Sequence, residues 1–117
     1  MEFINVRLAS LLFAALLPAA VTVSPTASAA SPSFNCAKAS STVEKLICSD
    51  PGLAELDRSL ASLYGTVLKN TPAGEQKMLK AEQRGWVKGR DDCWKSDDLR
   101  DCVASEYRLR INQLKDR

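Results

Sequence analysis

The segment LAELDRSLASLYGTVL, Leu53–Leu68, decides the fold of this chain. Its large apolar residues recur at steps of three and four positions, which places them on one stripe of an α-helix. They are Leu53, Leu56, Leu60, Leu63, Tyr64, Val67 and Leu68. An isolated helix of this kind is marginal in water, so the stripe must pack against other elements. No segment of the sequence shows the sustained alternation of a β-strand, and we therefore expect its partners to be helices.

Two helix-start signals precede this segment. Ser41 and Glu44 have the spacing of a capping box, which predicts a short helix from Thr42 to about Cys48. Pro51 disfavours a helical conformation at the residue before it, so this first helix must end there. The same proline suits the first position of the next helix, with Asp50 as its N-cap.

Two further helices are predicted after the break NTPAG, residues 70–74. The third starts near Gly74 or Glu75 and carries Met78, Leu79, Trp86 and Val87 inward. The fourth starts after a cap at Ser96 or Asp97, and its apolar face consists of Leu99, Cys102, Val103, Tyr107, Ile111 and Leu114. The sequence thus predicts an all-α bundle of three main helices plus a short N-terminal helix.

Residues 1–30 have the pattern of a cleaved export signal. The apolar run Leu8–Ala20 follows one basic residue, Arg7, and its 13 residues are too few for a stable membrane span. The small residues TASAA, ending at Ala30, form the expected cleavage pattern. We therefore predict a mature helical domain of residues 31–117 that is exported to the periplasm or secreted. Cys36 follows SFN instead of the small and aliphatic residues that precede a lipidated cysteine, so we expect no membrane anchor after cleavage.

All four cysteines lie in this predicted mature domain, which is too short to rely on its apolar core alone. An even number in an exported chain predicts two disulfides, and proximity favours Cys36 with Cys48 and Cys93 with Cys102. A four-thiolate zinc site is the competing interpretation. It requires pairs two to four residues apart, and the chain has neither such pairs nor a histidine. We expect no metal and no cofactor.

The charge argues against nucleic acid as a partner. The formal net charge is +2, and loss of the signal removes one charge of each sign, so the value is unchanged. Acidic and basic residues are interleaved, whereas a nucleic-acid-binding protein normally concentrates its basic residues on one face.

Catalysis is not expected either. The absence of histidine excludes every dyad or triad that needs one. Adjacent acids do occur, Asp91 with Asp92 and Asp97 with Asp98, but neighbouring side chains on a helix diverge by about 100° and do not converge on one substrate. We predict that the protein is not an enzyme.

Two charged residues occupy apolar positions. Asp57 lies within the stripe of the second helix, and Arg90 lies in the inward register of the third. An unpaired charge there would be costly to bury, which leads to the hypothesis of a half-buried structural ion pair between them. Arg110 of the fourth helix is the alternative partner for Asp57.

Four blocks in order carry a family resemblance: CAKASSTVEKLIC (36–48), LAELDRSLASLY (53–64), QRGWVKGRDDC (83–93) and CVASEYRLRINQL (102–114). Together they resemble the LprI-like lysozyme-inhibitor family of small exported bacterial helical domains. The resemblance implies binding and not chemistry, with lysozyme as the partner protein. The motif residues map onto Cys36, Glu44, Cys48, Leu56, Asp57, Tyr64, Gln83, Trp86, Arg90, Asp91, Cys93, Cys102, Tyr107 and Arg110. Most of them are explained as well by folding as by inhibition.

The candidate binding surface surrounds the turn between the third and fourth helices and consists of Trp94, Lys88, Lys95 and Arg100. One of these cations is a candidate to enter the lysozyme cleft and meet its catalytic carboxylates. Many animal lysozymes are basic, and an inhibitor attracted to them is expected to be acidic, whereas this chain is slightly basic. A local acidic patch, either Asp97 and Asp98 with Asp101 or Glu55 and Asp57, would serve the same purpose. An exposed Trp94 favours a binding role and a buried one favours a scaffold role. The alternative function is a periplasmic interaction or envelope-stress module with no lysozyme target.

Overall fold

The structure is a computed structural model that describes residues 14–20 and 31–117. Its elements are η1 (Cys36–Lys38), α1 (Thr42–Ser49), α2 (Pro51–Asn70), α3 (Ala73–Asp91), η2 (Asp92–Lys95) and α4 (Leu99–Lys115), where η is a 3₁₀ helix. The described residues contain no strand, so the prediction of three main helices behind a short leading one is confirmed. The predicted signal lies mostly outside the described residues and stays a prediction.

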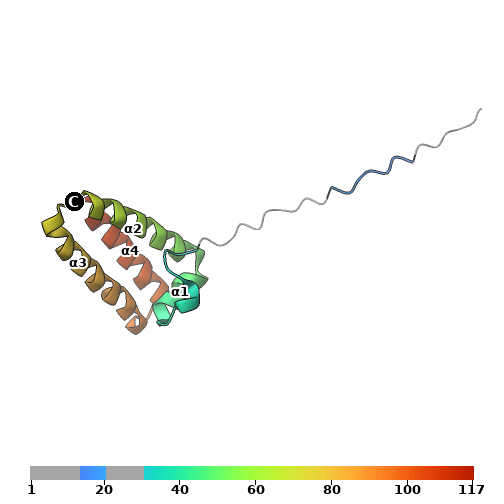
Figure 1. The fold of residues 1–117 in the computed structure, drawn as a ribbon. Coiled ribbons are helices and arrows are strands. Elements are labelled where there is room, and N and C mark those ends of the chain that lie inside the picture. Colours follow the sequence, from blue (N-terminus) through green and yellow to red (C-terminus); the bar gives the residue numbers. More distant parts are fainter. Residues whose placement is uncertain (1–13, 21–30) are drawn as a thin grey trace, which may run out of the picture.

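The three long helices run side by side, and α4 packs against both α2 and α3 (Figure 1). Successive long helices run in opposite directions, so the α2–α3 connection and the C terminus share one end of the bundle. The short helix α1 and the η2 turn lie at the other end (Figure 1).

Both predicted helix-start signals are present. The Ser41 hydroxyl accepts from the Glu44 amide at 3.0 Å, and the Glu44 carboxylate accepts from the Ser41 amide at 3.3 Å. Asp50 caps α2 by accepting from the Leu53 amide at 3.1 Å, directly before Pro51. These contacts satisfy amide groups that have no partner within the helix.

The predicted start of α4 is displaced by one or two residues. Asp98 is the N-cap and accepts from the Asp101 amide at 3.0 Å. Ser96 is not available as the cap because its hydroxyl accepts from the Asp98 amide within the turn, at 3.3 Å. The preceding helix α3 ends at Asp91, and Cys93 lies in the η2 turn that follows it.

One predicted core residue is wrong: Met78 is 69% exposed. The buried residue at the start of α3 is Leu79, whose side chain leaves the helix about 100° away from that of Met78. The face that packs inward therefore continues from Leu79 through Gln83 and Trp86 to Arg90, at steps of four, three and four residues.

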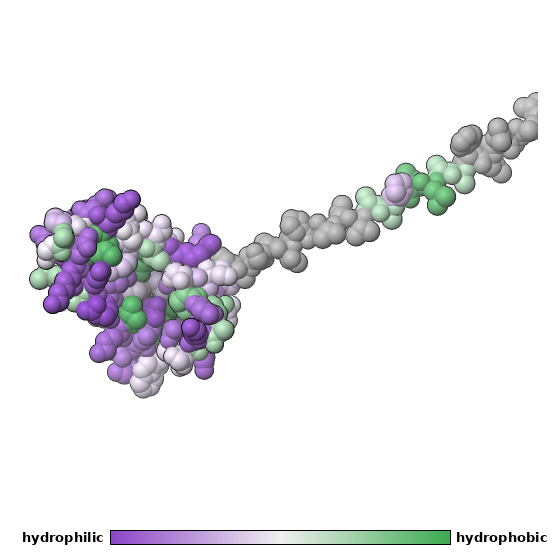
Figure 2. Space-filling view, in the orientation of Figure 1, coloured by the Kyte–Doolittle hydropathy of each residue, from purple (hydrophilic) through white to green (hydrophobic). Residues whose placement is uncertain are grey.

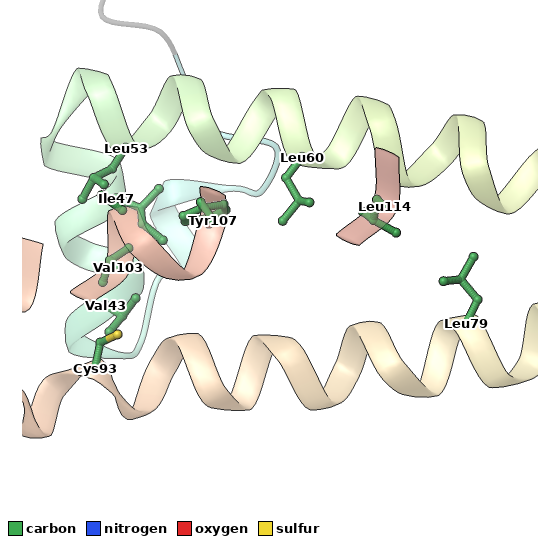
Figure 3. Close-up of a cluster of buried hydrophobic side chains, with 10 residues drawn as sticks. Val43, Ile47, Leu53, Leu60, Leu79, Cys93, Val103, Tyr107 and Leu114 are labelled. Atoms are coloured by element: carbon green, nitrogen blue, oxygen red, sulfur yellow. The ribbon is translucent and has the colours of Figure 1, made fainter. Parts of the chain in front are cut away.

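The core runs along the inner faces of all four helices (Figure 3). Its fully buried members include Leu53 and Leu60 from α2, Leu79 from α3, and Val103, Ala104, Tyr107 and Leu114 from α4; α1 contributes Val43 and Ile47. The full burial of Val43 and Ile47 explains why an eight-residue helix is stable here.

Both predicted disulfides are confirmed. Cys36 is bonded to Cys48, with Cα atoms 5.8 Å apart, and Cys93 to Cys102, with Cα atoms 5.7 Å apart. The first joins the segment before α1 to the end of that helix, and the second joins η2 to the first turn of α4. The described helices include none that is long and apolar enough to cross a membrane.

The junction between α1 and α2 is held by a charge pair with α4. The Arg100 guanidinium donates from Nε to Asp50 Oδ2 at 2.7 Å. This hydrogen bond, together with the one from the Leu53 amide, holds the pKa of Asp50 below its usual value. Burial acts to raise the pKa of Glu44, but hydrogen bonds from Ser41 and Ser40 outweigh it and lower that pKa as well.

These shifts predict how stability depends on pH. A carboxyl group whose pKa is lower in the folded chain stabilises the fold above its unfolded pKa, and that contribution is lost as pH falls through the folded value. We expect urea unfolding midpoints to be level near neutral pH and to fall between about pH 5 and pH 2.

Asp50→Asn is the matched variant, because asparagine keeps the N-cap but cannot ionise. The wild type should be the more stable protein near pH 7, and the difference should close as the pH falls. Equal stability of the two proteins at every pH would show that the Asp50 charge contributes nothing.

Candidate functional site

The most constrained polar residue is Asp57, which is 5% exposed on α2. Its Oδ1 accepts from the Tyr107 hydroxyl at 2.7 Å. Its Oδ2 accepts from both the amide and the hydroxyl of Ser33, each at 2.6 Å. Asp57 therefore connects the segment before η1 to the centre of α4.

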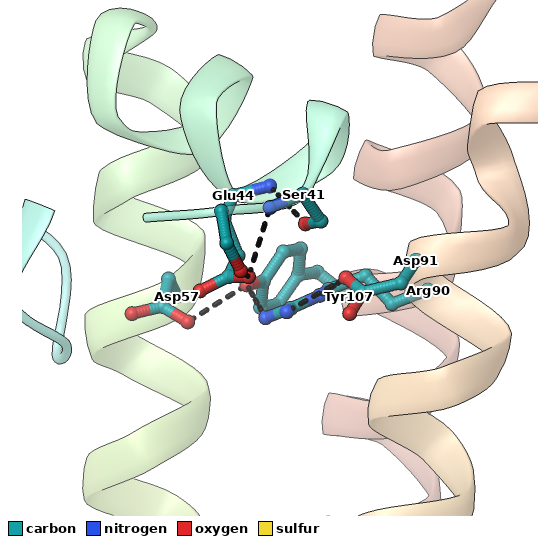
Figure 4. Close-up of polar contacts among 7 residues, drawn as sticks. Ser41, Glu44, Asp57, Arg90, Asp91 and Tyr107 are labelled. Carbon is teal, nitrogen blue, oxygen red and sulfur yellow. Dashed lines mark hydrogen bonds and ion pairs between the residues drawn. The ribbon is translucent and has the colours of Figure 1, made fainter. Parts of the chain in front are cut away.

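The Tyr107 hydroxyl also accepts from Arg90 Nη1 at 3.1 Å (Figure 4). Arg90 is 6% exposed on α3, and its Nε and Nη2 donate to Asp91 Oδ1 at 3.0 and 2.8 Å. The guanidinium carbon lies 5.7 Å from the centre of the Trp86 ring, in cation–π geometry. We call the chain of hydrogen bonds Ser33–Asp57–Tyr107–Arg90–Asp91 the relay. Its three central residues are buried, Ser33 is exposed and Asp91 is half-buried.

The structure brings Asp57 and Arg90 together through Tyr107 instead of in direct contact. Within the described part of the chain, the ion pair of Arg90 is with its neighbour Asp91. Figure 4 shows why: the tyrosine ring projects from α4 between α2 and α3, so its hydroxyl occupies the space between the two charges. Glu44 of α1 points toward the same cluster, and the Arg90 charge contributes to lowering the pKa of Glu44.

The environment of the relay raises the pKa values of two of its groups, Tyr107 and Arg90. Burial, reinforced by the neighbouring Asp57 carboxylate, raises the pKa of Tyr107 far above its usual value. Burial acts to lower the pKa of Arg90, but Tyr107 and Asp91 outweigh it and raise that pKa. Near neutral pH the Tyr107 hydroxyl therefore stays protonated and the Arg90 guanidinium stays charged, so both keep the hydrogen bonds described above.

Arg110, the alternative partner for Asp57, lies elsewhere. It is buried on α4, where its Nε donates to Gln83 at 2.9 Å and its Nη1 donates to Gln113 at 3.2 Å. Its Nη2 is 3.9 Å from a Glu82 carboxylate oxygen and makes no hydrogen bond within the described residues. Burial lowers the pKa of Arg110, although Glu82 opposes this. Arg110 therefore joins α4 to α3 without reaching the relay.

The surface candidates lie at the η2 turn. Trp94 is 61% exposed, whereas the next residue back, Cys93, is 2% exposed in its disulfide. The Lys95 ammonium lies 5.6 Å from the centre of the Trp94 ring and 3.5 Å from an Asp92 carboxylate oxygen. Arg100 is exposed but bonded to Asp50. Of the proposed cations, Lys88 alone makes no ion pair within the described residues.

The two tryptophans have different roles. The Trp86 indole N–H donates to the Glu106 carbonyl at 3.1 Å, and its ring meets Tyr107 edge to face at a centroid distance of 5.0 Å. It belongs to the scaffold. Trp94 projects from the turn, as expected of a residue in a binding role.

Three contacts were not anticipated from the sequence: Ser33 with Asp57, Tyr107 as the bridge, and Arg100 with Asp50. Only Tyr107 had a usable signal, because a tyrosine in a buried stripe must find a partner for its hydroxyl. The described residues contain no cluster of three or more acidic or cysteine side chains that would hold a metal.

Because the Tyr107 hydroxyl joins Asp57 to Arg90, its removal should destabilise the fold more than removal of another tyrosine hydroxyl. Tyr107→Phe leaves a buried oxygen of Asp57 and a buried nitrogen of Arg90 without their partner, which should lower the free energy of unfolding by about 2–3 kcal/mol. Tyr64→Phe is the matched control, because that hydroxyl lies outside the relay, and it should change stability by less than about 0.5 kcal/mol. Equal effects of the two variants in urea unfolding would contradict the role of the bridge.

The part of the chain that matches known proteins coincides with the helical domain. A family model described as "Lysozyme inhibitor LprI" matches residues 35–115, from the residue before η1 to the end of α4. No solved structure matches significantly.

Lipoprotein LprI of Mycobacterium tuberculosis and that of Mycobacterium bovis are each 34% identical to this chain over 116 residues. The alignments cover 97% of this chain and 56% of each mycobacterial protein, so the chain spans a little more than half the length of these relatives. The match over all four helices and both cysteine pairs shows that this chain belongs to the LprI lysozyme inhibitor family.

Proposed function

We propose that this chain is an exported, non-catalytic protein that binds lysozyme and blocks it, and so protects the cell wall. The observation that carries the proposal is the family match, which spans η1 and all four helices of the domain. The name of the matching family describes inhibition, and an inhibitor needs a rigid, complementary surface instead of reactive groups.

The use of polar groups supports binding without catalysis. The buried charged residues are Asp57, Arg90 and Arg110, and each is engaged with side chains of neighbouring elements. Catalytic groups, in contrast, must be open to a substrate. The view in Figure 2 shows a mainly hydrophilic surface with small, separate hydrophobic areas, which suits a protein that binds reversibly.

Both disulfides support an extracytoplasmic location, because such bonds persist in oxidising compartments. The predicted signal of residues 1–30 and the predicted mature domain of residues 31–117 are part of this proposal. The sulfur of Cys36 is bonded to Cys48, so it is not the attachment point of a lipid in this fold.

The test is cell-wall hydrolysis by chicken-type, goose-type and invertebrate-type lysozymes, with the oxidised domain titrated into each. We expect inhibition of at least one class that saturates at a simple molar ratio. The control is the domain after reduction and alkylation. It should not inhibit, because loss of both disulfides destabilises the folded surface. Full activity of every class at excess domain would contradict the proposal and favour an envelope interaction module with another protein partner.

A further inference from the structure

The η2 turn carries a large aromatic side chain, Trp94, on its surface. Trp94 is the most exposed aromatic side chain of the helical domain, at 61%. A tryptophan left in water is unfavourable for the folded chain alone, since its large apolar surface is not buried. Tryptophan is also the residue type most enriched among the anchors of protein interfaces.

Contacts within the chain fix the conformation of the η2 turn in the absence of a partner. Cys93, directly before Trp94, is buried and bonded to Cys102 of α4. Lys95, directly after it, covers one face of the indole and pairs with Asp92. A side chain fixed in this way loses little conformational freedom on binding, so more of its contact energy appears as affinity.

The charges around the turn identify the chemistry of the partner. Lys95 and Arg100 are both paired within the chain, with Asp92 and Asp50. Three exposed acids follow Trp94 without an ion pair among the described residues: Asp97, Asp98 and Asp101. Lys88, the candidate cation that makes no ion pair within the described part of the chain, lies on α3 one helical turn before η2, so the unpaired charge within the segment Asp92–Asp101 itself is negative.

The opposite end of the bundle has the opposite sign. The exposed lysines Lys69, Lys77, Lys80 and Lys115 lie where α2 and α4 end and in the first half of α3, and they outnumber the exposed acids of that end, Glu75 and Asp116. The small net charge of +2 thus hides an uneven distribution, with an acidic turn at one end and a basic surface at the other. A slightly basic chain can therefore present an acidic surface to a basic target.

We propose that the turn Asp92–Asp101 is the surface that contacts lysozyme, with Trp94 as its anchor and Asp97 and Asp101 attracting a cationic lysozyme. The inference rests on the proposed function and specifies which surface performs it. It favours acidic attraction over insertion of Lys95 or Arg100 into the catalytic cleft, because both cations already have carboxylate partners. Lys88, which has no such partner among the described residues, lies on α3 outside this turn. Opposite charge speeds encounter, and the anchor slows dissociation.

The first experiment measures binding of the oxidised domain to a cationic chicken-type lysozyme by surface plasmon resonance, together with inhibition of cell-wall hydrolysis. Trp94→Ala should raise the dissociation constant by about thirty-fold or more, mainly through faster dissociation. Met78→Ala is the matched control. Met78 is also exposed, at 69%, but lies on α3 about 20 Å along the helix from η2, and its loss should change binding less than about two-fold.

The second variant tests the charge. The double substitution Asp97→Asn and Asp101→Asn keeps Asp98 as the cap of α4 and removes two free acids. Association should slow by about three- to ten-fold at low salt, and the difference from wild type should vanish near 0.5 M salt because the interaction is screened. Thermal unfolding of each variant should match the wild type, since the substituted side chains are exposed.

The outcomes separate the two proposals. Inhibition by the wild type with loss of binding in Trp94→Ala supports the turn as the contact surface. Inhibition that Trp94→Ala leaves intact overturns the turn but retains the inhibitor function. A wild-type domain that neither binds nor inhibits any of the three lysozyme classes overturns the proposed function together with the inference built on it.

Discussion

The fold depends on one hydroxyl group, that of Tyr107. It donates to Asp57 on α2 and accepts from Arg90 on α3, while its ring is fully buried beside Trp86. Two charges that could not be buried alone are thereby satisfied at the centre of three helices. Ser33 extends the same network to the segment before η1, so the relay fixes the N-terminal part of the domain as well as the bundle. The direct ion pair suggested by the sequence would have joined two helices only.

Local signals in the sequence predicted the four helices, but not the 3₁₀ turns η1 and η2, the cap of α4 or the contacts across the bundle. The capping box at Ser41 and the Asp50–Pro51 junction depend on neighbouring residues, so both could be predicted from the sequence. The two disulfides follow from proximity along the chain. The side chain that faces inward at the start of α3 depends on how that helix is rotated against α4, and for this reason Met78 could not be distinguished from Leu79. The bridging role of Tyr107 requires the same knowledge of how the helices are placed.

The interior of the domain and its η2 turn have different roles. The relay and the contacts of Trp86 hold the helices of the bundle together, and the disulfide of Cys93 fixes the turn that leaves Trp94 exposed. A rigid support and a small exposed anchor are what a binding protein requires. Membership of the LprI family gives this arrangement its proposed target, and the acidic character of the turn explains how a slightly basic chain would approach a basic enzyme.

The most direct test of this account is nuclear magnetic resonance of the ¹⁵N-labelled oxidised domain as unlabelled chicken-type lysozyme is added. The two tryptophans provide an internal comparison, because each indole N–H gives its own signal. The account predicts that the Trp94 indole and the amides of residues 92–101 shift or broaden first, while the Trp86 indole, bonded to the Glu106 carbonyl, stays unchanged. Perturbations confined to the basic end around Lys69 and Lys77, with Trp94 unchanged, would contradict it.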